Sequence, residues 1–313
     1  MWQIFSRFLA LGLISFGGPA AHIGYFRKAF VDDLQWLDSK QYASFVALSQ
    51  FMPGPGSSQV GFAIGYHKGG VLGGLAAFLG FTLPSFLLLF LFAVTSAQWL
   101  EISAVQGMIH GLKLLAVVVV ADATLSMFTQ FCQRKTAKML MATTAVAIIL
   151  MPSMLMQIAV LVMAAIIGGI LLTRGENITP ENPPITLNYS WLALFILCLA
   201  SSLYFIGQDD TIGQIFAQFF QVGSLVFGGG HVVLPLLEAG VVEPGWATRD
   251  AFLAGYGAAQ AVPGPLFTFA AYLGAVLGPV PNGLAGAAIA LIAVFLPGFL
   301  LLLGIAPFWD RFR

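Results

Sequence analysis

The sequence predicts an all-α polytopic membrane protein: two inverted homologous repeats with Pro-Gly-Pro-broken helices, the second repeat incomplete. Composition gives the membrane class. Hydrophobic residues make up 59% of the chain and charged residues only 8%, with a mean hydropathy of +0.92, whereas a soluble domain carries about 25% charged residues. Repetition gives the architecture, because short motifs recur in the same order in the two halves of the 313 residues.

Apolar segments account for most of the chain, and a transmembrane helix needs about 20 apolar residues. The predicted spans, in chain order, are 3–20, 41–66, 69–97, 104–131, 139–151, 153–173, 189–207, 214–231, 250–277 and 282–304. Two of them, 41–66 and 250–277, are interrupted by Pro-Gly-Pro. The polar connectors 21–40, 174–188 and 238–250 are too short to form a soluble domain.

Four landmarks recur at an offset of 210 to 213 residues. They are FGGPAAHI (16–23) with FGGGHVVL (227–234), Trp36 with Trp246, SQFMPGP (49–55) with AQAVPGP (259–265), and LPSF (83–86) with LPGF (296–299). A constant offset over ordered landmarks indicates duplication. The predicted organisation is a first repeat at 1–173, a linker with one transmembrane span at 174–211, and a second repeat at 212–313. The second repeat lacks its C-terminal spans, through natural shortness or truncation.

The orientation follows from the loop 132–138, which is basic and carries no acid. The positive-inside rule puts it in the cytoplasm. Counting from there, span 3–20 runs outward and its copy 214–231 runs inward, so the halves are inverted. The count takes each broken segment as one crossing; a re-entrant segment is the alternative.

The Pro-Gly-Pro breaks are candidate anion sites. Proline is tolerated at a helix start, where the first N–H groups lack intrahelical acceptors and face anions favourably. Paired breaks in inverted halves are typical of midplane sites in secondary transporters. The candidate groups are Gln50, Gly54, Pro55, Ser57 and Ser58, matched by Gln260, Gly264, Pro265 and Thr268. The alternative, a kink used for packing only, is disfavoured by the duplication.

The glycine pairs after Phe16 and Phe227 have two open interpretations, close helix packing or close approach to a ligand. They are Gly17 and Gly18, and Gly228 and Gly229. Ionisable residues in or near spans are functional candidates by default. The candidates for charge or proton coupling are His22, Lys113, Asp122 and His231.

These motifs, above all FGGPAAHI, SQFMPGPGSSQ and FGGGHVVLPLLE, resemble the chromate ion transporter family, whose long members have two homologous halves. The resemblance covers nearly the whole chain. It implies a multi-pass protein of the bacterial cell (inner) membrane that exports chromate, driven by the proton motive force as an antiporter, and confers chromate resistance. Sulfate is the structural analogue. The family's motif positions here are Gly17, Gly18, Pro53, Gly54, Pro55, Gly228, Gly229, Pro263, Gly264 and Pro265.

Other function classes lack their signatures. Net charge is zero, so no nucleic-acid partner is expected. The four histidines and two cysteines show no metal-ligand spacing, and neither a metal nor a cofactor is expected. A membrane-embedded enzyme would need a nucleophile and base at one depth, and the sequence shows none. The expected partners are chromate or a sulfate-like oxyanion, the lipid bilayer and, because the second repeat is short, a second copy of the chain. The rival substrate is sulfate or another small anion.

Overall fold

The structure is a computed structural model that describes residues 1–99, 132–151, 187–206, 208, 210–227 and 233–309, with separate positions within 106–129 and 156–167. All regular elements in these residues are helices, as the apolar composition predicts. The chain forms two compact units, one of Met1–Ala116 with Thr186–Arg313 and the other of Val117–Ile185.

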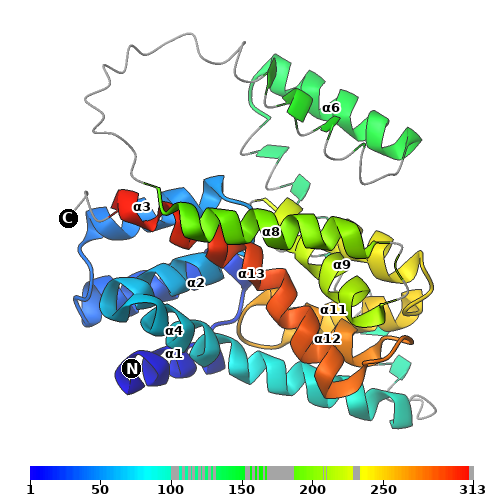
Figure 1. The fold of residues 1–313 in the computed structure, drawn as a ribbon, viewed down its shortest axis with the longest axis horizontal. Helices are drawn as coiled ribbons and strands as arrows, with labels where there is room; N and C mark the ends of the chain where they lie inside the picture. Colours follow the sequence, from blue (N-terminus) through cyan, green and yellow to red (C-terminus); the bar gives the residue numbers. More distant parts are fainter. Residues whose placement is uncertain are drawn as a thin grey trace. The chain divides into compact units, whose positions relative to one another are not determined.

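The larger unit contains most of the helices. They are α1 (Trp2–Ile14), α2 (Gly18–Arg27), the π-helix η1 (Lys28–Asp33), α3 (Ser39–Phe51), α4 (Gly56–Trp99), α8 (Tyr189–Phe205), α9 (Thr211–Leu225), α10 (Val233–Leu237), the π-helix η2 (Glu238–Val242), α11 (Arg249–Ala261), the 3-10 turn η3 (Leu266–Thr268), α12 (Phe269–Val276) and α13 (Gly283–Trp309). Within this unit, α1, α2 and α3 lie at one end, α9, α11 and α12 lie at the other, and α4, α8 and α13 run between the ends (Figure 1).

The first broken segment turns back on itself and forms a hairpin over residues 36–68, here called the first hairpin. The Phe45 ring of α3 lies 6.2 Å from the His67 ring near the end of the first part of α4. The Lys68 ammonium lies 5.4 Å from the centre of the Trp36 ring. The start and end of the segment therefore lie together, and a single crossing of the membrane by 41–66 is not what the structure shows.

The second broken segment, residues 246–278, has the same shape and is here called the second hairpin. The N–H of Gly278 donates to the carbonyl of Trp246 at 2.8 Å. The Tyr272 hydroxyl donates to the Ala251 carbonyl at 3.1 Å. This segment, too, begins and ends at one place, and its Pro-Gly-Pro lies at the tip of the hairpin.

The first predicted span also ends earlier than expected. Helix α1 stops at Ile14, and α2 and η1 occupy residues 18–33, which the polar side chains suggested were a connector. Phe8 stacks on Phe30 at 4.7 Å, so α2 and η1 return along α1. The phenylalanines of α2 and η1 pack against α1, and a count of charged residues does not predict this packing.

The longest apolar helices of the unit are the second part of α4 and α13. Gly69 and Gly70 interrupt α4, and Gly70 has a φ of +61°, which a glycine tolerates. Gly56–Thr95, which includes this turn, and Gly283–Ile305 are the two helices in the described part of the chain that are long and apolar enough to cross a membrane. Shorter apolar helices, such as α8, accompany them.

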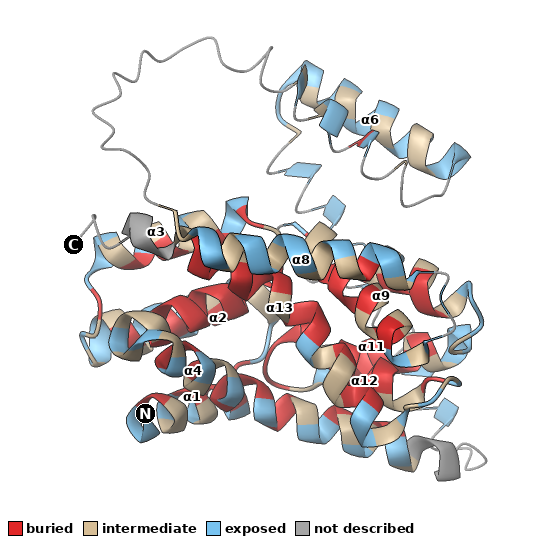
Figure 2. Cartoon of the chain, viewed as in Figure 1, coloured by how far each residue is buried: buried red, intermediate tan, exposed pale blue. Residues whose placement is uncertain are grey.

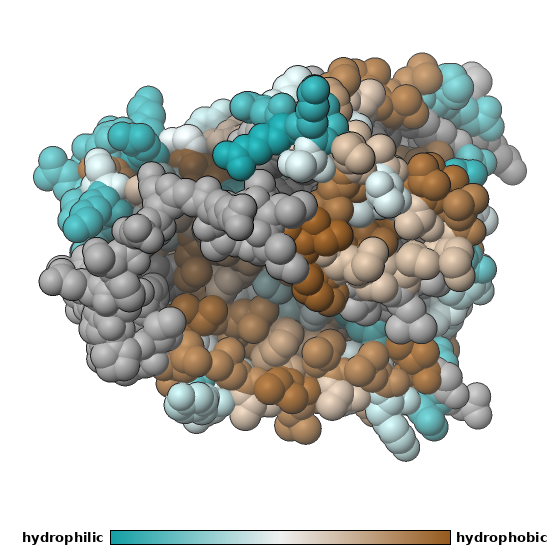
Figure 3. Space-filling view, turned by 90° about the horizontal axis from the view of Figure 1, so that it is seen from above, coloured by the Kyte–Doolittle hydropathy of each residue, from teal (hydrophilic) through white to brown (hydrophobic). Residues whose placement is uncertain are grey.

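Helix α13 lies at the centre of the unit and is buried along much of its length (Figure 2). By contrast, α4 exposes a stripe of apolar side chains at helical spacing: Leu72, Leu75, Leu79, Leu83, Leu87, Leu91 and Val94. Apolar residues also dominate the lower margin of the face drawn in Figure 3. An exposed apolar surface of this extent is typical of a membrane or protein interaction site.

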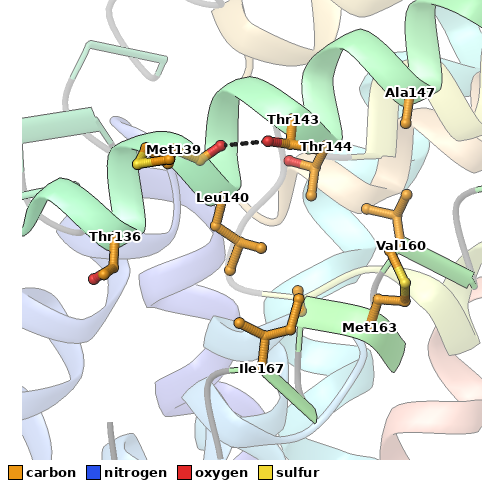
Figure 4. A pocket seen from close by; sticks show the side chains of 10 residues that line it. Thr136, Met139, Leu140, Thr143, Thr144, Ala147, Val160, Met163 and Ile167 are labelled. Carbon is orange, nitrogen blue, oxygen red and sulfur yellow. Dashed lines mark hydrogen bonds between the residues drawn. The ribbon is translucent and has the colours of Figure 1, made fainter. Parts of the chain in front are cut away.

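The smaller unit contains α6 (Lys135–Leu150). An apolar pocket lies between this helix and residues 160–167, where Leu140 and Ala147 face Val160, Met163 and Ile167 (Figure 4). The Thr143 hydroxyl donates to the carbonyl of Met139 at 2.8 Å, so this polar group in the pocket wall is satisfied within α6.

Candidate functional site at the helix breaks

A backbone hydrogen bond connects each hairpin tip to the other half of the chain. The N–H of Gly54, in the first tip, donates to the carbonyl of Val226 at the end of α9 at 2.7 Å. The N–H of Gly264, in the second tip, donates to the carbonyl of Ser15 at the end of α1 at 2.9 Å. The carbonyls at these helix ends lack intrahelical donors. Each break therefore satisfies an orphan group of the opposite half.

Close packing at the tips explains the two central glycines. Gly54 has a φ of +117° and Gly264 a φ of +103°, values that side chains other than glycine rarely adopt. A Cβ on Gly54 would lie 3.0 Å from the Cα of Gly298, and one on Gly264 would lie 2.8 Å from the Oγ of Ser85. Protein atoms therefore occupy the space beside both glycines.

His22 brings the FGG element of the first half to the start of α4. Its Nδ1 lies 3.3 Å from the Oγ of Ser57, the second residue of α4. Its Nε2 lies 3.3 Å from the carbonyl of Ser15, the group that also accepts from Gly264. The ring is fully buried and meets Phe81 edge-on at 5.1 Å. Two predicted site residues, His22 and Ser57, are thus in contact.

Gln59 is a polar residue of the site that the sequence analysis missed. Its Nε2 donates to the carbonyl of Pro53 at 2.7 Å, across the break, and is 3.5 Å from the carbonyl of Gly298. The side chain is fully buried. A glutamine inside an apolar run, four residues after the second proline of a break, was the available signal.

The polar groups of the second tip bind one another. The Thr268 hydroxyl donates to the carbonyl of Pro265 at 2.7 Å, and its oxygen lies 3.0 Å from the Oγ of Ser85. The Thr268 N–H also donates to the carbonyl of Pro265, at 3.0 Å, within η3. Thr268 is where the sequence predicts a ligand group, but its hydrogen bonds close the helix start.

Other predicted site residues lie away from the contact between His22 and Ser57 or among residues that the structure does not describe. Gln50 is exposed, and Gln260 donates to the Tyr256 hydroxyl at 2.9 Å. Gly17 and Gly18 form the link between α1 and α2, with φ of +97° and +75°. Pro263 and Pro265 are buried beside Gly264, whereas Pro53 is half-buried. Five predicted residues lie outside the described residues: Lys113, Asp122, Gly228, Gly229 and His231.

Five buried side-chain polar atoms in the described residues have no partner; two of them are the Oγ1 of Thr82 and the Oε1 of Gln221. The Oγ of Ser15, the Oγ of Ser58 and the Oε1 of Gln59 are buried and make no hydrogen bond in the structure. Leaving such a group unpaired costs about 1–3 kcal/mol. Serine hydroxyls next to the free N–H groups of a helix start can donate to an anion. The described residues contain no cluster of three or more metal-ligating side chains.

Comparison with known proteins identifies the family of the chain. The sequence pattern of the chromate transporter family matches residues 2–170 and 213–313. A chromate transport protein of Pseudomonas aeruginosa is 30% identical over 331 residues, covering 99% of this chain and 73% of the relative. The chromate transport protein of Cupriavidus metallidurans is 26% identical, over 99% of this chain and 75% of its own length.

An uncharacterized transporter of Methanocaldococcus jannaschii is 28% identical over 99% of this chain and 77% of its own. No solved structure matches the chain. The family pattern covers well over half of the sequence and contains both hairpins. The chain therefore belongs to the chromate transporter family of membrane proteins.

Proposed function

We propose that the chain is a secondary active transporter of a tetrahedral oxyanion, chromate foremost, and that the start of α4 is where the anion binds. The observation that carries the proposal is the set of unpartnered buried hydroxyls at this helix start, Ser58 and the neighbouring Ser15. Helix starts present N–H donors and a partial positive charge, which suit an oxyanion.

We also propose that residues 1–173 and 212–313 are inverted repeats joined by a linker with one span. The reciprocal bonds from Gly54 and Gly264 support this, because each joins one break to the opposite half. The two π-helices, η1 and η2, begin 210 residues apart, at Lys28 and Glu238. The first hairpin lies at one end of the unit and the second at the other (Figure 1).

The finer features of the function follow the family resemblance. We propose a multi-pass protein of the cell membrane that exports chromate at the expense of the proton motive force, by antiport in the family's manner, with His22 as the described candidate for coupling. Curated relatives named chromate transport proteins support chromate. Sulfate has the same shape and charge, so it is the second candidate.

Reconstitution tests the proposal. Purified protein in liposomes should move chromate and sulfate when each is supplied in turn, and Ser58→Ala should reduce the rate at subsaturating anion. Gln50→Ala, at an exposed position outside the tip, is the matched control and should transport as the wild type does. Equal transport rates for the two variants would show that the anion does not bind at the start of α4. If the wild type transports neither chromate nor sulfate, the proposed function is wrong.

A further inference from the structure

The contact between His22 and Ser57 has a fixed hydrogen-bond direction. The carbonyl of Ser15 can only accept, so in the neutral imidazole Nε2 carries the proton and Nδ1 is the acceptor. The Ser57 hydroxyl must therefore donate to Nδ1 across their 3.3 Å contact. In this state the Ser57 proton is engaged, and the oxygen offers only lone pairs, which repel an anion.

Protonation of His22 reverses this contact. A proton from solution forms the Nδ1–H bond, and Nδ1 then donates to the Oγ of Ser57. Ser57 keeps its own hydroxyl proton, which is free to turn towards an anion at the start of α4. The Nε2–H bond to Ser15 is unchanged. The unpartnered hydroxyl of Ser58 is the next residue along the same helix start.

The surroundings leave this ring without a competing ionic partner among the described residues. The ring contacts Ser15, Ser57 and Phe81. From α3, the buried Tyr42 directs its hydroxyl to the Ile23 carbonyl, and Lys68 of α4 lies over Trp36. The charged residues of α1, α2, η1 and α3 are exposed: Arg7, Arg27, Lys28, Asp32, Asp33 and Lys40.

We propose that His22 couples proton binding to oxyanion binding with a positive sign, through the hydroxyl of Ser57. This rests on the proposed function for its site, and makes His22 a positioning residue that acts through Ser57. A proton on His22 and an anion at the start of α4 then favour each other's binding.

Proton uptake on anion binding tests the proposal directly. The probe is sulfate, which does not titrate near neutral pH as chromate does. Sulfate added to the purified wild type in weakly buffered solution should make the solution more alkaline, as protons are taken up. Sulfate affinity should rise about tenfold as the pH falls from about 7 to about 4, because a buried ring without an ionic partner takes up a proton only in acid, and a hydrogen bond to a charged group is then gained.

Three variants separate the roles. His22→Gln retains a donor and an acceptor but cannot take up a proton, so its affinity should stay at the high-pH value with no proton uptake. Ser57→Ala should lose the low-pH gain because the responding hydroxyl is gone. His67→Gln, at the mouth of the first hairpin, should behave as the wild type.

Proton release, or binding without proton exchange, in the wild type would overturn the coupling, and this holds even if His22→Gln does not fold. Binding of neither sulfate nor chromate at either pH would overturn the proposed function as well.

Discussion

The first and second hairpins have the same backbone shape, but the hydrogen bonding of their polar side chains differs. Both turn back at Pro-Gly-Pro with a glycine at positive φ, and both donate that glycine's N–H to the opposite half. In the second hairpin, Thr268 and Ser85 satisfy one another and the helix start. In the first, Ser58 and the Oε1 of Gln59 have no partner.

This difference indicates a division of roles. The two tips have the same backbone turn, but Thr268 of the second tip has hydrogen-bond partners, whereas Ser58 and the Oε1 of Gln59 in the first have none. At the positions that correspond to Ser57 and Gln59, the second hairpin carries Phe267 and Phe269, which belong to the buried core. We infer that the second tip is a structural counterpart and that the first tip is where a ligand is accommodated.

The largest expected effect is in cysteine labelling, where each introduced cysteine should react fully from one face of the membrane and not at all from the other. In a background with Cys132 and Cys198 replaced by serine, a cysteine at Ser39 or Lys68 should react with a membrane-impermeant reagent from one face only. A cysteine at Thr248 or Asn282 should react only from the other face. Labelling of cysteines at Ser39 and Lys68 from opposite faces would show that the first broken segment crosses the membrane. Labelling of cysteines at Ser39 and Thr248 from the same face would show that the two halves are not inverted.

Next in size are the tip glycines. Gly54→Leu and Gly264→Leu should both lose folded protein, because the left-handed conformation costs about 1–2 kcal/mol and overpacking about 1–3 kcal/mol. Gly70→Ala is the control, with a φ of +61° but no atom within 4 Å of the added Cβ. The measurement is the thermal stability of detergent-solubilised protein. If Gly264→Leu were folded and Gly54→Leu not, the tips would not be equivalent in structure.

The smallest effects separate the two tips in chemistry. Ser58→Ala should weaken anion binding, because one hydrogen bond is worth about 0.5–1.5 kcal/mol, and should leave stability nearly unchanged. Thr268→Val should lower stability by a similar amount through its lost bond to Pro265, and leave affinity unchanged. Titration with sulfate and a melting curve on each variant make the comparison. The opposite pattern would assign the ligand to the second tip.

Sequence patterns predicted the helical class, the family resemblance, the positions of both breaks and most helix ends within a few residues. They did not predict that 41–66 turns back, because 26 apolar residues are long enough to cross a bilayer and hydropathy carries no information on direction. The contacts that reveal the hairpin, Phe45 with His67 and Lys68 with Trp36, are tertiary.

Local chemistry drew attention to individual residues of the candidate site, whereas only packing shows which of them lie together. His22 and Ser57 were each predicted from their own motifs, but their contact depends on how α2 returns along α1. Gln59 was missed because a helix tolerates glutamine without any local signal. Thr268 was predicted as a ligand group because the matching residue in the first half, Ser58, has the same chemistry. Only the structure shows that its hydroxyl is already engaged.

Each hairpin is shorter than a bilayer is thick, so the thickness of the bilayer bears on the geometry at the two tips. Helices α3 and α11 have 13 residues each, or about 20 Å at 1.5 Å per residue, while the hydrocarbon core is about 30 Å thick. If the two hairpins enter from opposite interfaces, as the proposed inversion requires, with Trp36 and Trp246 as their anchors, they overlap by only about 10 Å in the middle. Hydrophobic mismatch in lipids with longer acyl chains would draw the two anchors apart. That strain falls on the bonds of Gly54 and Gly264, so membrane thickness acts on the centre of the protein through its two tips.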